Sequence, residues 1–234
     1  MYNELKESLQ LAQKLDEVKV VLVYGAQGDF SSGNDMDNFI NLPPDSAQNI
    51  SDFTFAFAGL TKPLYFFVQG CAVGIIATMA AHADFVYCSE NAFFFTPFMG
   101  LQLATEGLCS IKFPEIMGRR KAAEVLFLDQ RVTAQDALKY RFINGIIKRD
   151  DLPATEPLIQ DIEKLPYLKK LLSTDSKTMQ NAKKLLVQGQ DMQRLRQHNM
   201  LEQTLCENAQ LAPGFKDHIR NYMKKGMKKE QPKL

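Results

Sequence analysis

The hydrophobic pattern of residues 1–25 predicts a helix followed by a strand. Leu5, Leu9, Ala12 and Leu15 recur at helical spacing, so we expect an amphipathic helix with one buried face. The helix is followed by residues 18–25, VKVVLVYG. This segment is rich in β-branched side chains, which is typical of a buried strand. A turn-rich segment, GAQGDFSSGND, follows the strand.

Residues 64–83 hold no Lys, Arg, Asp or Glu, and two interpretations of this run compete. Its length would suffice to cross a bilayer. However, Gly70 and Gly74 interrupt it, and strand-like LYFFVQG precedes helix-like GIIATMAAHA. The strand-then-helix pattern favours the core of a globular domain, so we expect no membrane span.

The remaining pattern alternates between short strands and helices. Residues 84–90 (DFVYCSE) and 91–97 (NAFFFTP) predict two strands, and residues 142–148 (FINGIIK) predict a last one. Residues 119–128 form an amphipathic segment, and Thr133 is a candidate N-cap for the helix that follows it. This alternation predicts an α/β architecture.

Chain length, net charge and the content of cysteine and histidine limit the kinds of protein that this sequence can encode. A chain of 234 residues fits one large domain or one domain with an appendage; we expect a core at residues 1–150 and a helical region at 151–234. The net charge of +1 favours neither nucleic acid nor a membrane surface as a partner. Four cysteines without a C-x-x-C pair, and only three histidines, favour free thiols over a metal site or a disulfide framework.

Two glycine-containing strand exits are candidate sites of chemistry: residues 24–35 (YGAQGDFSSGND) and 68–76 (VQGCAVGII). The glycine spacing does not fit G-x-G-x-x-G, and neither a P-loop nor G-x-S-x-G occurs, which excludes dinucleotide, P-loop and serine-hydrolase sites. Tight glycine turns can offer backbone N–H groups to an oxyanion. Most glycine turns after strands are only turns, so this signal is weak by itself.

Residues 96–107, TPFMGLQLATEG, contain one ionisable side chain, Glu106. Two interpretations of Glu106 follow from the residues alone. It is either a solvated loop carboxylate, as most acidic residues are, or a base placed among apolar neighbours. In the second case Phe98, Met99 and Leu103 would raise its pKa towards what proton transfer requires.

Taken together, these motifs resemble a known family. GDFSSGND, KPLYFFVQGCAVGIIATMAAHAD and FFTPFMGLQLATEG stand in the order and spacing of the enoyl-CoA hydratase/isomerase, or crotonase, superfamily. The resemblance covers residues 1–150 well and the remainder loosely, and it is closest to Δ3,Δ2-enoyl-CoA isomerases of the peroxisomal type. It implies a crotonase-like ββα spiral core followed by a helical C-terminal trimerisation region.

The resemblance assigns roles to particular positions. It places an oxyanion hole at the backbone N–H groups of Asn34 and Ile75, the latter directly after Gly74. The pantetheine and thioester end of an acyl-CoA would lie along the first glycine turn, at Ser31, Ser32, Gly33, Asn34 and Asp35.

The same resemblance separates isomerisation from hydration. The two catalytic glutamates of the hydratases fall on Thr78 and Phe98, which cannot act as acid or base, so hydration by that route should fail. The isomerases use one glutamate further along the loop, where Glu106 stands. Glu106 would take the C2 proton of a 3-enoyl-CoA and return it to C4, in β-oxidation of unsaturated fatty acids.

Cofactors, partners and location follow from the resemblance as expectations. It implies no metal or redox cofactor, because CoA is part of the substrate. It also implies a homotrimer or a dimer of trimers, with residues 155–225 at the subunit contacts. The final Pro-Lys-Leu, residues 232–234, is similar to a Ser-Lys-Leu signal and favours the peroxisome, with the mitochondrion second.

The chain departs from the family pattern at its beginning. Family members usually begin with further strands, whereas residues 1–5, MYNEL, resemble the start of the helix that follows those strands. We expect these strands to be missing, which would expose the sheet edge formed by residues 18–25. An acyl-CoA-binding protein with impaired catalysis is therefore the alternative to an active isomerase, and a hydratase is a third.

Overall fold

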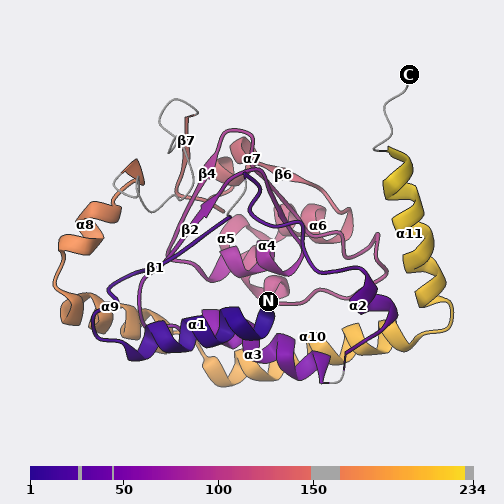
Figure 1. Cartoon of the computed structure of the whole chain (residues 1–234), viewed down its shortest axis with the longest axis horizontal. Helices are drawn as coiled ribbons and strands as arrows, with labels where there is room; N and C mark the ends of the chain where they lie inside the picture. Colours follow the sequence, from indigo (N-terminus) through magenta and orange to yellow (C-terminus); the bar gives the residue numbers. More distant parts are fainter. Residues whose placement is uncertain (26–27, 44, 149–163, 230–234) are drawn as a thin grey trace.

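Two small β-sheets form the centre of the fold in the computed structural model, which describes residues 1–25, 28–43, 45–148 and 164–229 (Figure 1). The first sheet is parallel, with strand order β1-β2-β4-β7: β1 (Val21–Tyr24), β2 (Leu64–Val68), β4 (Phe85–Ser89) and β7 (Gly145–Ile147). The second has the order β3-β5-β6, in which β3 (Cys71–Val73) is parallel and β6 (Val132–Thr133) antiparallel to β5 (Phe93–Phe95).

The predicted strands are confirmed, although several are shorter than their hydrophobic segments. All five residues of β2 are buried, as its uninterrupted apolar sequence requires. The chain steps from the first sheet to the second after β2 and again after β4, so the two strands predicted at residues 84–97 lie in different sheets. Among the described strands, β1 has a single neighbour, β2.

Three helices pack in a layer beneath the sheets: α1 (Tyr2–Lys14), α3 (Ser46–Ala58) and α10 (Met192–Leu211) (Figure 1). The predicted first helix is confirmed, with Leu9 buried, but Leu15 is exposed because α1 ends at Lys14. Phe53 and Phe57 of α3 are buried, and the Phe57 ring meets that of Phe66 in β2 edge to face, with 5.9 Å between centroids.

Further short helices connect the strands. The connecting elements are α2 (Asp37–Ile40), α4 (Ile75–Met79), the 3-10 turn η1 (Ala80–His82), α5 (Cys109–Met117), α6 (Arg119–Phe127) and α7 (Ala134–Lys139). The side chain of Thr133 accepts a hydrogen bond from Asp136 N–H, which confirms the predicted cap of α7.

The described part of the predicted C-terminal region is helical, with α8 (Leu168–Ser173), α9 (Ser176–Gln188), α10 and α11 (Phe215–Lys229). The predicted domain boundary at residue 150 and the tail at residues 232–234 lie outside the described residues. None of the helices that the structure describes is both long and apolar enough to span a membrane.

Candidate functional site

The two glycine turns predicted to carry chemistry lie side by side. Ser31 N–H donates to Cys71 O at 2.8 Å, and Val73 N–H donates back to Ser31 O at 3.0 Å. At the ends of these paired segments, Gly33 and Gly74 have φ angles of 98° and 67°, a region that glycine adopts without strain. A Cβ on Gly74 would lie 3.7 Å from the Cα of Gly33, so the turns are in close contact.

The residues that follow these glycines present free backbone N–H groups. Ile75 is the first residue of α4, where no carbonyl of the helix can accept its N–H. Within the described residues, no hydrogen bond uses the N–H of Ile75 or of Asn34. The Asn34 side chain is held by Asn38, whose Nδ2 donates to its Oδ1 at 3.0 Å. Two neighbouring amides are therefore available to an oxygen atom.

Both turns line an apolar cavity of about 170 Å³. Gly74, Ile75 and Asn34 form one part of its wall, and Glu106 is the only carboxylate among its described lining residues. The apolar part of the wall comes from several elements, with the side chains of Met36, Phe39, Val73, Phe95, Phe98, Leu101, Leu103 and Tyr222. The cavity thus combines an apolar space with one candidate base.

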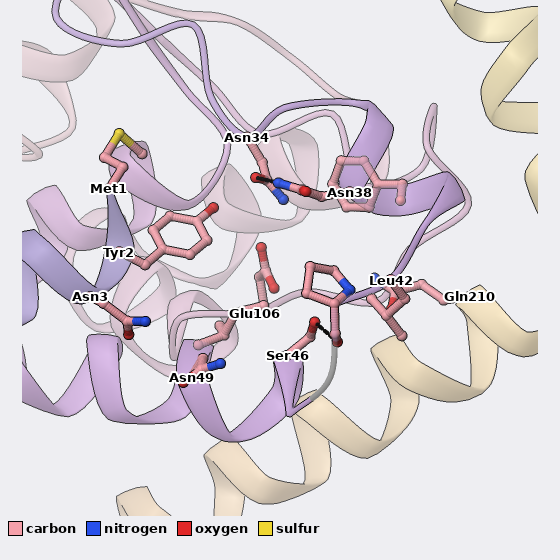
Figure 2. Close-up of a pocket in the computed structure, with 13 residues that line it drawn as sticks. Met1, Tyr2, Asn3, Asn34, Asn38, Leu42, Ser46, Asn49, Glu106 and Gln210 are labelled. Atoms are coloured by element: carbon pink, nitrogen blue, oxygen red, sulfur yellow. Dashed lines mark hydrogen bonds between the residues drawn. The ribbon is translucent and has the colours of Figure 1, made fainter.

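A second, more polar cavity of about 230 Å³ shares Glu106 and Asn34 with the first. In Figure 2 the Glu106 carboxylate and the Tyr2 ring project into the same space, with Asn34 and Asn38 across it. Glu106 therefore stands at the junction between an apolar compartment and a polar one.

The surroundings of Glu106 change its acidity. Burial raises the pKa of its carboxyl to about 7, and the nearby carboxylate of Glu202 adds to the rise. The pKa of the Tyr2 hydroxyl is also raised, first by burial and then by the Glu106 charge. A carboxyl with this pKa can both take and give a proton near neutral pH. The solvated-loop interpretation of Glu106 does not describe this site.

The backbone after Glu106 is tightly fixed. Gly107 and Leu108 both have positive φ, at 70° and 62°. His82 Nε2 lies 2.9 Å from Gly107 O, and because burial lowers the pKa of His82 to about 4, the ring is neutral and donates through Nε2–H. The polar edge of the partly buried His82 ring is therefore hydrogen-bonded within the fold. Cys109, two residues after Gly107, is fully buried.

The remaining predicted residues differ in how close they lie to the cavities. Ser32 and Gly33 line the apolar cavity with Asn34. Ser31 lines none of the described cavities; its Oγ accepts Gly33 N–H at 3.2 Å and supports the turn. Asp35 lines only a more open outer cavity, and its carboxylate accepts Asp37 N–H at 3.0 Å, as a turn residue does.

The positions that carry glutamates in the hydratases hold neutral side chains with other functions. Thr78 is buried, and its hydroxyl donates to Ile75 O at 2.7 Å at the start of α4. Phe98 is buried and contributes apolar surface to the cavity wall. Among the described residues, no cluster of His, Cys, Asp and Glu side chains is arranged to hold a metal ion.

Sequence reasoning missed Tyr2, Asn38, Glu202 and Tyr222. Tyr2 and Tyr222 reach the cavities from α1 and α11, which are helices far from the glycine turns in the sequence. Asn38 lies four residues after Asn34, a helical spacing that could have suggested a side-chain pair. Glu202 carries no local signal, because an acidic residue within a helix is ordinarily solvent-exposed.

Comparison with known proteins agrees with this geometry. Residues 1–231 match the family described as "Enoyl-CoA hydratase/isomerase". Human enoyl-CoA delta isomerase 2 is 40% identical over 146 residues, which cover 58% of this chain and 36% of that protein. Mouse peroxisomal enoyl-CoA delta isomerase 3 is 37% identical over 145 residues, covering 58% of this chain and 45% of that protein.

A solved structure supports the same assignment. OdaA from Pseudomonas aeruginosa superimposes with a TM-score of 0.84 at 27% identity, covering 95% of this chain and 87% of that one. The sequence matches span less than half the length of the two curated relatives, whereas the family match extends over residues 1–231. The chain belongs to the enoyl-CoA hydratase/isomerase family and has the crotonase fold.

Proposed function

We propose that this chain is a Δ3,Δ2-enoyl-CoA isomerase in which Glu106 moves the proton. One observation carries the proposal: Glu106 is the sole carboxylate among the described residues lining an apolar cavity that also contains two free backbone N–H groups. The names of the human and mouse relatives support the same reaction class. A second carboxylate, which a water-adding enzyme would use, is missing from the described wall of this cavity.

The proposed reaction uses these groups in one sequence of steps. The thioester oxygen of a 3-enoyl-CoA accepts hydrogen bonds from the N–H groups of Asn34 and Ile75. Glu106 removes a proton from C2, the electrons move into a dienolate, and the amides stabilise its oxygen. The protonated Glu106 then delivers the proton to C4, which leaves a 2-trans-enoyl-CoA and regenerates the carboxylate.

The rate contributions that are typical of a general base and of oxyanion donors agree with these proposed roles. A positioned base contributes about 10²–10⁴-fold to the rate. Each oxyanion donor contributes about 10²–10³-fold. A pKa of about 7 lets Glu106 hold the proton between the two transfers and then release it. No redox or metal cofactor takes part in these steps, since CoA is carried by the substrate.

Isomerisation is favoured over hydration by the side chains at two positions. Thr78 is hydrogen-bonded to the backbone of α4, and Phe98 covers the cavity wall. Neither can activate a water molecule or protonate the product of its attack. The protein is therefore proposed to shift a double bond, as a step in the β-oxidation of unsaturated acyl chains, rather than to add water.

We also propose that the protein assembles as a homotrimer or a dimer of trimers. Leu185 and Leu186 on α9, and Leu201 and Leu205 on α10, are each at least 49% exposed. Exposed apolar side chains on neighbouring helices are typical of subunit contacts. Light scattering after size-exclusion chromatography would measure the assembly.

A peroxisomal location is proposed on two grounds. One is the similarity of residues 232–234 to a Ser-Lys-Leu signal. The other is the name of the mouse relative, a peroxisomal isomerase. A fluorescent fusion with and without these three residues would test the location, and a mitochondrial signal would favour the second address.

The decisive experiment compares the wild type with Glu106→Gln and Glu115→Gln. Purified protein is incubated with 3-cis- and 3-trans-enoyl-CoA, and formation of the conjugated thioester is followed by absorbance. Glu115 is an exposed residue of α5, so its variant is a matched acid-to-amide control. We expect Glu106→Gln to lose at least ~10²-fold in kcat while it still binds acyl-CoA, and Glu115→Gln to keep wild-type turnover.

Other results would have definite meanings. Equal turnover by the wild type and Glu106→Gln would contradict the role of Glu106. Binding of acyl-CoA without turnover by the wild type would favour the acyl-CoA-binding alternative. Formation of a 3-hydroxyacyl-CoA from a 2-enoyl-CoA would favour a hydratase.

A further inference from the structure

Glu202 is a buried carboxylate for which the proposed reaction has no direct use. It lies on α10 with 3% of its surface exposed. Its Oε2 accepts Leu108 N–H at 2.8 Å, and its Oε1 accepts the hydroxyl of Ser110. A buried carboxylate is costly unless its oxygens are hydrogen-bonded, and these two donors from the segment after Glu106 meet that need.

The hydrogen-bond chain continues to the protein surface. His198 Nε2 lies 2.8 Å from the Ser110 hydroxyl oxygen. Because that hydroxyl has one proton and donates it to Glu202, the His198 ring must be the donor in this contact. His198 is partly exposed and lies one turn before Glu202 on α10, so the hydrogen bonds lead from the surface, through Ser110 of α5, to the buried carboxylate.

The segment bound by Glu202 has an uncommon backbone conformation. Leu108 has a φ of 62° although it carries a branched side chain, and it directly follows Gly107, which also has a positive φ. Such a conformation persists only where its surroundings hold it. The N–H of Leu108 is held by Glu202, and Cys206, one turn further along α10, contacts Ala104 O through its sulfur at 3.2 Å.

We propose that Glu202 is a positioning residue for the isomerase reaction: through Leu108 N–H and the Ser110 hydroxyl it fixes the loop that aims Glu106 at the substrate. This inference rests on the proposed function of Glu106. Helix α10 thereby contacts both sides of the catalytic glutamate, at Ala104 and at Leu108.

The charge of Glu202 supports a second effect on the same base. The groups facing Glu106 are the Tyr2 hydroxyl from α1, the Cys109 thiol from α5, and the Cys206 thiol and Glu202 carboxylate from α10. Burial raises the pKa of both thiols and of the phenol, so these three groups are neutral at physiological pH. Burial raises the pKa of Glu202 as well, but the hydrogen bonds that it accepts from Leu108 N–H and the Ser110 hydroxyl favour its carboxylate form, and that charge adds to the rise in the pKa of Glu106.

Glu202→Gln tests the proposal, because its single amide oxygen can still accept Leu108 N–H, whereas the charge and the acceptor for the Ser110 hydroxyl are lost. Glu207→Gln is the matched control, since it removes a carboxylate from the half-buried next turn of the same helix. Ser110→Ala is the second variant and breaks the chain to His198 without altering Glu202 itself. Steady-state rates with 3-enoyl-CoA are measured as a function of pH, together with the urea midpoint of unfolding.

We expect Glu202→Gln to lower kcat by about 10- to 100-fold with little change in KM, as a small misplacement of a catalytic group does. The acidic limb of its kcat/KM profile should move to lower pH, because removal of the neighbouring charge lowers the pKa of Glu106. Ser110→Ala should lower kcat less, and Glu207→Gln should match the wild type.

Two results would overturn the proposal. One is a Glu202→Gln variant with the wild-type kcat and the wild-type acidic limb. The other is a loss of kcat explained entirely by unfolded protein with the limb unmoved, as a purely structural residue would give. If the wild type itself does not isomerise 3-enoyl-CoA, the proposed function fails first, which is a distinguishable outcome.

Discussion

The loop between β5 and α5 has two halves that are held in different ways. In the outer half, residues 97–103, Asp129 accepts Met99 N–H at 3.0 Å and Gly100 N–H at 2.5 Å. This contact lies near the surface, where the Met99 side chain is 43% exposed. In the inner half, residues 104–108, the equivalent backbone contacts are made by buried partners.

Within the inner half, residues 107–108 have little access to water, whereas residues 104–106 are partly exposed. Leu108 is fully buried, its N–H binds the buried Glu202, and Gly107 O accepts a hydrogen bond from the partly buried ring of His82. Where a contact at the surface is lost, water can replace it, but a buried group is left without a partner. The loop is therefore adaptable at residues 99–100 and fixed at residues 107–108, directly after Glu106.

Replacement of Gly107 by alanine should break the inner half most severely. Its Cβ would lie 2.3 Å from Thr78 Oγ1, and its φ of 70° is unfavourable for alanine. We expect a loss of about 1–2 kcal/mol from the backbone and about 1–3 kcal/mol from overpacking. Gly118→Ala is the control, because Gly118 has a φ of 78° with nothing near its Cβ. In urea unfolding, Gly118→Ala should lose less free energy of unfolding than Gly107→Ala. Equal losses would mean that the space around Gly107 can accommodate a methyl group.

The pH dependence of wild-type kcat/KM should report the raised pKa of Glu106 in the inner half of the loop. Catalysis requires ionised Glu106, whose pKa is raised to about 7. Below that pH the carboxyl is protonated and cannot take the C2 proton, so kcat/KM should fall about tenfold per pH unit and level off above it. A profile that is flat down to pH ~5, near the ordinary glutamate pKa, would show that the base is solvated.

Tyr222→Ala should change the outer half without affecting the base. Tyr222 of α11 lines the apolar cavity together with Leu101 and Leu103. Its removal should favour longer acyl chains by ~10-fold in relative kcat/KM, a typical effect of one or a few methylenes in a pocket. Rates across a series of acyl-CoA lengths would show the change, and the acidic limb should stay in place. An unchanged length preference would mean that acyl chains end elsewhere.

Asp129→Asn should have the smallest effect. The amide keeps one acceptor for Met99 or Gly100, and water can reach the other N–H, so we expect a loss of no more than about 1 kcal/mol in unfolding free energy. This variant is the outer counterpart of Glu202→Gln, since both change an acid to an amide beside the same loop. A shift of the acidic limb in Asp129→Asn would remove the distinction between the two halves.

Much of the fold and the core of the site could be predicted from local sequence. The apolar run of β2 and the glycines at 33 and 74 are signals within a few residues, and they locate the strands and both turns. Glu106 is the one ionisable side chain in residues 96–107, and the family resemblance, rather than composition, singled it out as the base. Its burial could not be derived from composition, since most loop carboxylates are exposed.

The residues of α10 that hold the loop around Glu106 could not be predicted, because their contacts depend on packing between elements that are distant in the sequence. Glu202 and Leu108 are 94 residues apart, and Cys206 and Ala104 are 102 residues apart. On α10 the side chains of Asn199, Glu202 and Gln203 are buried, although in the sequence they look like the solvated face of a helix. Only the packing of α10 on the rest of the fold turns that polar face inward.

The position of α11 has a consequence for the order of synthesis. His218 lies 2.8 Å from Gly100 O although the two residues are 118 positions apart, and Tyr222 on the same helix lines the apolar cavity. A ribosome makes the strands, both glycine turns and Glu106 well before this helix. During translation the proposed base and amides are therefore present before the apolar cavity has its final wall, and that wall is complete only when α11 docks.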